Sequence, residues 1–119
     1  MGNSPDIKNR TYEFALNVIM LLDSLDKKDF VVQIIGKQVL RSSTSIGANV
    51  IEAQAGSSTK DFVNYYHYAL KSANETQFWL KLLKDSRKLD KSIIEPMVDE
   101  CLQISKILGA IIVKIKNKS

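Results

Sequence analysis

Apolar and small residues recur along this 119-residue chain at alternating spacings of three and four, and this period constrains the fold more than any other feature. The clearest repeat runs through residues 59–85, and it consists of Phe62, Tyr66, Ala69, Ala73, Thr76, Leu80 and Leu83. A period near 3.6 places such residues on one face of an α-helix. No stretch sustains the two-residue alternation of a β-strand. The sequence therefore predicts an all-α protein.

Three other segments show the same helical period. The first covers about residues 9–24, and its predicted core stripe consists of Tyr12, Ala15, Ile19 and Leu22. Further apolar residues widen this stripe beyond one face, namely Phe14, Val18, Met20 and Leu21. The second covers about residues 30–54, with apolar positions at Ile34, Ile35, Val39, Leu40, Ile46 and Val50. The last begins after Ser92, and its stripe consists of Ile94, Met97, Cys101, Ile104, Leu108, Ile111 and Ile115. Each segment is long enough for an amphipathic helix of several turns.

Short polar connectors separate the four segments. Four amphipathic helices joined in this way predict an antiparallel up-and-down four-helix bundle. A chain of this length buries enough surface for one hydrophobic core. We therefore expect a single domain over residues 1–119, with residues 1–8 as a flexible N-terminal arm.

Residue types at the segment ends predict where the helices stop and start. Gly56 suits a left-handed position just after the second helix. Ser58 and Ser92 each stand three residues before an acidic residue, as in a capping box. Pro96 is then expected in the first turn of the last helix, where its missing N–H costs nothing.

The residues that usually carry chemistry are scarce. One cysteine, Cys101, and one histidine, His67, cannot make a structural zinc site. Asn64 stands three residues before His67, where a di-iron bundle would need Glu. Cys101 lies on a core stripe, where a buried small hydrophobe is favoured over a nucleophile. We expect no catalytic, metal-binding or cofactor-binding residue and no small-molecule substrate, and hence a protein that is not an enzyme.

The composition also favours a soluble, cytoplasmic protein that does not enter a membrane. No apolar run reaches the roughly 20 residues that a membrane-spanning helix needs. The early residues do not form a signal peptide. A single cysteine leaves no internal disulfide to require an oxidising compartment.

The second segment contains the stretch RSSTSIGANVIEAQAG, which is rich in poor helix formers. On a helix, Gly36, Ser43 and Gly47 fall along one line. Small residues on such a line let a neighbouring helix approach the backbone closely and gain dispersion contacts. We therefore expect close helix packing along this line.

A second line of the same helix is polar, and it predicts a polar layer that joins the second and third segments. A buried polar or charged group needs a partner. We expect Arg41 to pair with Glu75 or with a carboxylate of a neighbouring subunit. The expected layer consists of Arg41, Ser45, Asn49, Glu52 and Glu75.

Apolar residues in excess of one core stripe indicate a second buried surface, which favours assembly into a homo-oligomer. The excess is greatest in ILGAIIVKI, residues 107–115. The alternative is a broad core stripe with a few exposed apolar residues. The candidate interface residues are Tyr65, Tyr68, Trp79, Ile107, Ile112 and Val113. For the three aromatic residues among them, stacking on unpaired bases is a second interpretation.

Basic residues gather near the end of the third segment and in the connector that follows it. The net charge of the chain is only +4, so this cluster permits an anionic partner without identifying one. The candidate contacts to nucleic-acid phosphates are Lys81, Lys84, Arg87, Lys88 and Lys91. The alternative is that these side chains only solvate the surface.

Three stretches of the chain also resemble a known family. RSSTSIGANVIEAQAG, STKDF and ALKSANETQFWLKLL are similar to the signature of a bacterial four-helix-bundle family. Its members include proteins encoded in intervening sequences of large-subunit ribosomal RNA genes, often labelled ribosomal-protein-like. Relatives of the accessory variability determinant of diversity-generating retroelements also belong to it. The resemblance extends from YEFAL, at Tyr12, to the last helix, although Gly47 replaces a common Pro and Leu40 a common Arg.

The resemblance implies a bundle that assembles as a ring, typically a pentamer, and binding of RNA, DNA or a reverse transcriptase through a basic surface. Together with the residues, it predicts a non-enzymatic, oligomeric accessory protein that contacts nucleic acid or a nucleic-acid enzyme. The alternative function is an oligomeric scaffold directed only at proteins, without any nucleic-acid contact.

Overall fold

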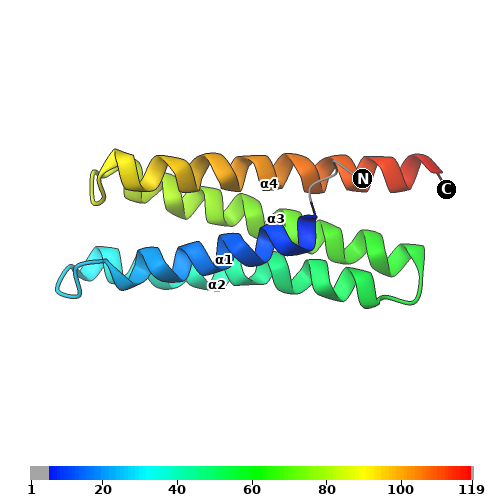
Figure 1. The fold of residues 1–119 in the computed structure, drawn as a ribbon, viewed down its shortest axis with the longest axis horizontal. Helices are drawn as coiled ribbons and strands as arrows, with labels where there is room; N and C mark the ends of the chain where they lie inside the picture. Colours follow the sequence, from blue (N-terminus) through cyan, green and yellow to red (C-terminus); the bar gives the residue numbers. More distant parts are fainter. Residues whose placement is uncertain (1–5, 119) are drawn as a thin grey trace.

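The computed structural model describes residues 6–118, and these form four α-helices joined by short connectors (Figure 1). The helices are α1 (Ile7–Asp23), α2 (Phe30–Ala55), α3 (Thr59–Asp85) and α4 (Lys91–Lys118). The chain turns back at each connector, so the helices follow the long axis of a body measuring 50 × 24 × 20 Å. The described part of the chain contains no β-strand. The prediction of an all-α, single-domain protein with four helices is confirmed.

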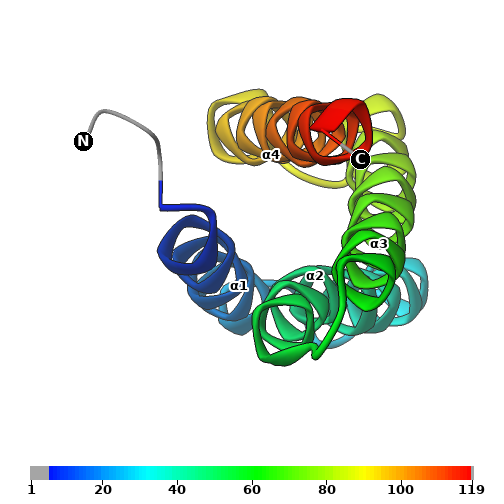
Figure 2. The same ribbon diagram turned by 90° about the vertical axis from the view of Figure 1, so that its right-hand side faces the viewer.

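The helices do not pack equally against one another. Helix α2 packs most extensively on α3, and α3 packs extensively on α4. The contact of α1 with α2 is smaller, and that of α1 with α4 is the smallest of the four. Figure 2 shows the helices end-on as an open arc, with α1 and α4 at its two ends. The seam between α1 and α4 is therefore the weakest of the four.

The predicted core stripes of α3 and α4 face the interior. In α3, every stripe residue from Tyr66 to Leu83 is buried, and Phe62 is half-buried. In α4, the buried face is shifted by one residue at two positions, since Val98 and Ile112 are buried while Met97 and Ile111 are half-buried. The three-and-four spacing therefore predicted the buried face of these two helices.

The predicted core stripe of α1 is wrong. Tyr12 and Ile19 are exposed, and the buried residues of this helix are Ile7, Thr11, Phe14, Val18 and Leu21. The helix carries two apolar stripes, and both satisfy the helical period. The stripe with Phe14 faces the other helices, which leaves the stripe with Tyr12 on the surface.

Helix α1 is the neighbour that approaches the small residues of α2. A Cβ placed on Gly36 would lie 3.1 Å from Leu22 Cδ2, and one placed on Gly47 would lie 3.4 Å from Thr11 Oγ1. Ser43 is fully buried. The glycines therefore let α1 lie close to the α2 backbone, as their alignment predicted.

Several helix ends differ from the predictions. Asp6 caps α1 by accepting from the Asn9 amide at 3.3 Å, so residues 6–8 of the expected arm belong to this helix and its cap. Residues 1–5 of that arm lie outside the described part of the chain. The end predicted correctly is that of α3, where Ser58 caps the helix by accepting from the Asp61 amide at 3.1 Å. Gly56 is extended, with φ −66° and ψ 150°, and is not left-handed.

The start of α4 also lies earlier than predicted. The helix begins at Lys91, and Asp90 accepts from the Ser92 amide at 3.0 Å and from the Ile94 amide at 3.1 Å. Asp90 therefore takes the capping role expected of Ser92. Pro96 consequently lies inside the helix, beyond its first turn.

Candidate functional site

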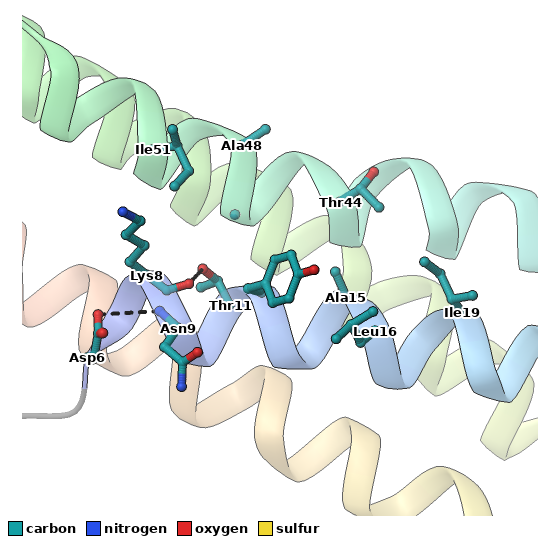
Figure 3. A pocket seen from close by; sticks show the side chains of 12 residues that line it. Asp6, Lys8, Asn9, Thr11, Ala15, Leu16, Ile19, Thr44, Ala48 and Ile51 are labelled. Atoms are coloured by element: carbon teal, nitrogen blue, oxygen red, sulfur yellow. Dashed lines mark hydrogen bonds between the residues drawn. The ribbon is translucent and has the colours of Figure 1, made fainter.

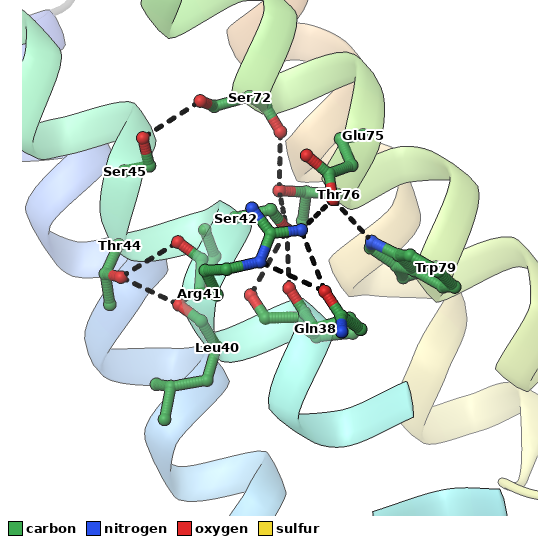
Figure 4. Close-up of polar contacts among 12 residues, drawn as sticks. Gln38, Leu40, Arg41, Ser42, Thr44, Ser45, Ser72, Glu75, Thr76 and Trp79 are labelled. Atoms are coloured by element: carbon green, nitrogen blue, oxygen red, sulfur yellow. Dashed lines mark hydrogen bonds and ion pairs between the residues drawn. The ribbon is translucent and has the colours of Figure 1, made fainter. Parts of the chain in front are cut away.

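Arg41, Glu75 and Trp79 form a polar cluster on the outer side of the α2–α3 seam (Figure 4). The Arg41 guanidinium donates to Glu75 Oε2 and, at 2.8 and 3.0 Å, to Gln38 Oε1. Trp79 Nε1 donates to the same Glu75 oxygen at 3.0 Å. These hydrogen bonds, first that of Trp79 and then that of Arg41, lower the pKa of Glu75. Glu75 is thus a carboxylate held ionised by two donors from different helices.

A row of hydroxyl groups continues from this cluster along the seam (Figure 4). The buried Thr76 Oγ1 donates to Ser42 Oγ at 2.8 Å, and Ser72 Oγ donates to Ser45 Oγ at 3.0 Å. Ser42 also donates to the Gln38 carbonyl of its own helix at 2.9 Å. Such bonds satisfy polar groups that would otherwise be costly to bury. They explain why the helix keeps hydroxyl residues of low helix propensity.

Of the remaining residues of the expected polar layer, Asn49 joins this row and Glu52 does not. Asn49 Nδ2 donates to the Ser45 carbonyl at 2.9 Å and to Ser45 Oγ at 3.1 Å. Glu52 is exposed and forms no ion pair among the described residues. The layer therefore extends from Arg41 to Asn49.

A small polar pocket opens beside the hydroxyl row. Its volume is about 310 Å³, and its lining residues are Ser45, Asn49, Tyr68, Lys71, Ser72 and Glu75. The Tyr68 ring packs edge-to-face on Tyr65, with ring centroids 5.9 Å apart, and Tyr68 is 51% exposed. Lys71 is exposed and forms no ion pair within the described part of the chain. The sequence analysis included most of these residues but did not bring them into one pocket.

The five candidate basic residues lie at the end of α3 and the start of α4, but two of them form ion pairs with carboxylates of this chain. Lys84 Nζ lies 3.7 Å from Glu95 Oε2, and Lys88 Nζ lies 3.0 Å from Asp29 Oδ2. The other three are exposed and form no ion pair among the described residues; they are Lys81, Arg87 and Lys91. Three free cations therefore remain in this cluster.

An apolar groove of about 630 Å³ runs between α1 and α2 on the outer surface (Figure 3). Its lining includes Thr11 and Gly47, where α1 packs closely against the α2 backbone. Exposed apolar side chains flank it, namely Tyr12, Leu16, Ile19 and Ile51. The sequence analysis missed this surface because it assigned the stripe with Tyr12 and Ile19 to the core.

The structure places the six candidate interface residues in different environments. Ile112 is buried in the core of the single chain, so its assignment to an interface is wrong. The helix is apolar on nearly all sides there, and periodicity alone could not show which side faces α3. Tyr65, Trp79 and Ile107 are half-buried against the core. Only two of the six are exposed, Tyr68 and Val113.

Cys101 is buried, and its Sγ donates to the Ala73 carbonyl at 3.3 Å. Burial raises the pKa of this thiol to about 12, so it stays protonated near neutral pH. No group of three or more His, Cys, Asp or Glu side chains within residues 6–118 is arranged to hold a metal ion. No helix in this range is long and apolar enough to cross a membrane.

The fold and these surfaces define the class as a small, single-domain four-helix protein. The chain belongs to the family of 23S rRNA-intervening sequence proteins, whose family model matches residues 4–110. It is also similar to a solved structure, a protein of unknown function from the S23 ribosomal protein family of Bacteroides thetaiotaomicron VPI-5482. The identity is 39%, the TM-score is 0.82, and the match covers 89% of this chain and 97% of the other. Among curated proteins, none matches the chain.

The comparisons confirm the family that the signature stretches indicated. They also agree with the four-helix fold, because the two chains superpose over most of their lengths. Neither the family name nor that of the Bacteroides protein refers to an enzymatic activity.

Proposed function

We propose that this protein is a non-enzymatic, oligomeric accessory protein that contacts nucleic acid, or an enzyme acting on nucleic acid, through a basic surface at the α3–α4 connector. The observation that carries this proposal is the group of three exposed cations that form no ion pair within residues 6–118, namely Lys81, Arg87 and Lys91. Cationic side chains that are free of carboxylates are available to phosphates. The family name, which refers to an intervening sequence of 23S rRNA, supports a role close to nucleic acid.

Assembly is the second part of the proposal. The groove between α1 and α2 exposes apolar side chains that a contact with another copy would cover. Its partner surface would be a different face of the next copy, and such head-to-tail contacts close into rings when the rotation permits. The family resemblance favours a pentamer. A ring would repeat the three cations and strengthen a weak single contact through avidity.

Titration of the purified protein with labelled RNA and duplex DNA tests the nucleic-acid contact. The variant carries Lys81→Gln, Arg87→Gln and Lys91→Gln, and the matched control carries Lys37→Gln, Lys60→Gln and Lys106→Gln, which replace three other exposed lysines. Both variants lose three charges, so a general charge effect weakens binding equally in both. We expect the connector variant to bind about tenfold or more weakly than the control, and wild-type affinity to fall steeply between about 50 and 200 mM salt. Equal losses, or no binding at low salt, would overturn the nucleic-acid contact.

Light scattering tests the assembly with a Leu16→Glu variant, because this substitution places a charge at the α1–α2 groove. The control is Leu102→Glu, since Leu102 on α4 is similarly exposed, 41% against 38%. We expect the wild-type protein to be oligomeric and Leu16→Glu to dissociate it. A monomeric wild type would overturn the assembly. Dissociation by Leu102→Glu alone would place the interface on α4. An oligomer without nucleic-acid binding is the outcome expected of a purely protein-directed scaffold.

A further inference from the structure

We propose that the polar pocket between α2 and α3 holds one unpaired base of a single-stranded nucleic acid, with Tyr68 stacking on the base and Lys71 contacting its phosphate. This inference rests on the proposed nucleic-acid contact. It adds a separate site and specifies that the bound strand is unpaired there. Helix α3 carries Tyr68 and Lys71 of the pocket and also Lys81 of the connector cluster.

The size of the pocket suits one ring system. Its volume of about 310 Å³ lies at the lower end of the range for small-ligand pockets, about 300 to 1,000 Å³. A base in a duplex is stacked and paired, so only an unpaired base can be placed in such a pocket. The pocket therefore selects single strands over duplexes.

Tyr68 offers a stacking surface that is already ordered. Its edge-to-face contact with Tyr65 restrains the ring, and about half of Tyr68 remains open to solvent. A ring that is fixed before binding loses less conformational entropy when a base stacks on it. Replacing an aromatic side chain on which a base stacks by alanine weakens binding by about fivefold to a hundredfold.

Two side chains of the pocket, Glu75 and Asn49, each offer one free hydrogen-bond acceptor. Glu75 uses Oε2 for both Arg41 and Trp79, and Asn49 uses its amide nitrogen for Ser45. Glu75 Oε1 and Asn49 Oδ1 accept no hydrogen bond from the described residues. Such acceptors bind the exocyclic amino group of adenine, cytosine or guanine, which uracil and thymine lack. The pocket therefore favours amino-bearing bases.

Charge around the pocket is compatible with a phosphate. The Glu75 carboxylate is neutralised by Arg41, and the Lys71 ammonium is exposed and free of ion pairs among the described residues. Phe78 follows Lys71 by seven residues on the same helix face and is 56% exposed, which provides a second aromatic surface. Lys81 stands ten residues after Lys71, about 15 Å along the helix axis. A strand bound in the pocket can thus continue toward the connector cations.

Fluorescence anisotropy with labelled ten-nucleotide strands of A, C or U and a ten-base-pair duplex tests the site at about 50 mM salt. We expect the wild type to bind the A and C strands several-fold more tightly than the U strand and the duplex. Tyr68→Ala should weaken binding of the C strand about tenfold, whereas Tyr68→Phe retains the ring and most of the affinity. Lys71→Gln should weaken binding and reduce the slope of log affinity against log salt by about 0.7.

Matched controls separate this site from other surfaces. Phe30→Ala removes another exposed aromatic side chain, at the start of α2 and away from the α1–α2 groove, and Lys106→Gln removes an exposed lysine on α4. If these controls weaken binding as much as Tyr68→Ala and Lys71→Gln do, the pocket is not the site. Equal binding of the U and C strands would also overturn the proposal. Circular dichroism at increasing temperature confirms that each variant folds.

Further outcomes distinguish this inference from the proposed function. Loss of binding in the connector variant, with no effect of Tyr68→Ala or Lys71→Gln, would overturn the pocket and leave the connector contact standing. Loss of binding in the pocket variants, with no effect in the connector variant, would support the pocket as the binding site and overturn the connector contact. Binding of adenosine monophosphate as tight as that of the A strand would identify a free nucleotide as the ligand and overturn a strand site. No binding of any strand would overturn both proposals.

Discussion

Arg10 on α1 and Glu100 on α4 form a two-point ion pair across the weakest seam of the bundle. Arg10 Nε lies 2.7 Å from Glu100 Oε2, and Arg10 Nη2 lies 2.8 Å from Glu100 Oε1. Arg10 Nη2 also donates to Gln103 Oε1 at 2.8 Å. The hydrogen bonds to Glu100 raise the pKa of Arg10. A planar guanidinium that meets both carboxylate oxygens fixes geometry as well as supplying attraction.

We predict that this pair contributes measurably to stability. Its side chains are 26% and 31% exposed, so water screens it less than it screens a surface pair. Arg10→Ala and Glu100→Ala should each lower the free energy of unfolding by about 1 kcal/mol, with a coupling of roughly 0.5–1 kcal/mol in a double-mutant cycle measured by urea unfolding. The comparison is the pair of Lys84 and Glu95, at 3.7 Å and with single-point contact. A coupling no larger than that of this comparison pair would contradict the prediction.

A second prediction concerns the pH dependence of stability through Glu75. The pKa of Glu75 is lowered in the folded protein, by the Trp79 hydrogen bond first and then by Arg41. The stabilisation is therefore fully present above the ordinary pKa of about 4.5 and is lost as the pH falls through the lower folded pKa. In thermal unfolding between pH 6 and pH 3, the difference between wild type and Glu75→Gln should shrink below about pH 4.5.

Trp79 provides a direct readout of this titration because it is the only tryptophan of the chain. Its fluorescence should change with an acid midpoint below about 4.5 in the wild type, and this change should be absent in Glu75→Gln. Arg41→Gln should move the midpoint upward, since it removes one of the two donors. A wild-type midpoint above 4.5 would contradict the assigned hydrogen bonds.

Much of the fold follows from the sequence because periodicity and burial agree in α3 and α4. Along α3 only the stripe from Phe62 to Leu83 runs without a charged residue, so the helical period has one solution. In α1 two apolar stripes both fit the helical period. Which of them is buried depends on where α2 and α4 lie, and the local sequence of α1 does not contain this information. Similarly, Asp90 and Ser92 are both good caps, and local preference alone does not decide between them.

The candidate site was less predictable than the fold. The sequence left two partners open for Arg41, either Glu75 or a carboxylate of a neighbouring subunit, and the structure shows the pair with Glu75. The ion pair between Lys88 and Asp29 could not be predicted, since it depends on the packing of the α1–α2 connector against the end of α3. The pocket beside Tyr68 likewise depends on the depth at which the two helices meet.

A third prediction concerns the helix glycines, which differ in the space around them. A Cβ on Gly109 would meet no atom within 4 Å, whereas one on Gly47 would touch Thr11. Gly109→Ala should raise the free energy of unfolding by about 0.5–1 kcal/mol, because alanine is the better helix former. Gly47→Leu should lower it by about 1–3 kcal/mol through overpacking against α1, while Gly109→Leu, as the matched control, should have little effect. Chemical denaturation of the four proteins measures these differences, and equal tolerance of leucine at both positions would contradict the close approach of α1.

The last prediction concerns Arg87, the one non-glycine residue with positive φ among the described residues. Its φ is 61°, and it ends α3 with the hydrogen bonds of a Schellman motif, from the Lys88 amide to the Leu83 carbonyl at 3.2 Å and from the Arg87 amide to the Lys84 carbonyl at 3.1 Å. The left-handed conformation costs an L-residue roughly 1 kcal/mol, and glycine avoids this cost.

Arg87→Gly should therefore raise the free energy of unfolding by about 0.5–1 kcal/mol, in spite of the greater entropy of glycine in the unfolded chain. Arg87→Ala removes the same charge but keeps the strain, so it should leave stability nearly unchanged. The difference between the two variants in urea unfolding isolates the backbone effect. A destabilised Arg87→Gly variant beside a neutral Arg87→Ala variant would show that the α3 end does not hold this conformation. Because both variants remove one connector cation, both should also weaken nucleic-acid binding to the same small extent if Arg87 contacts a phosphate.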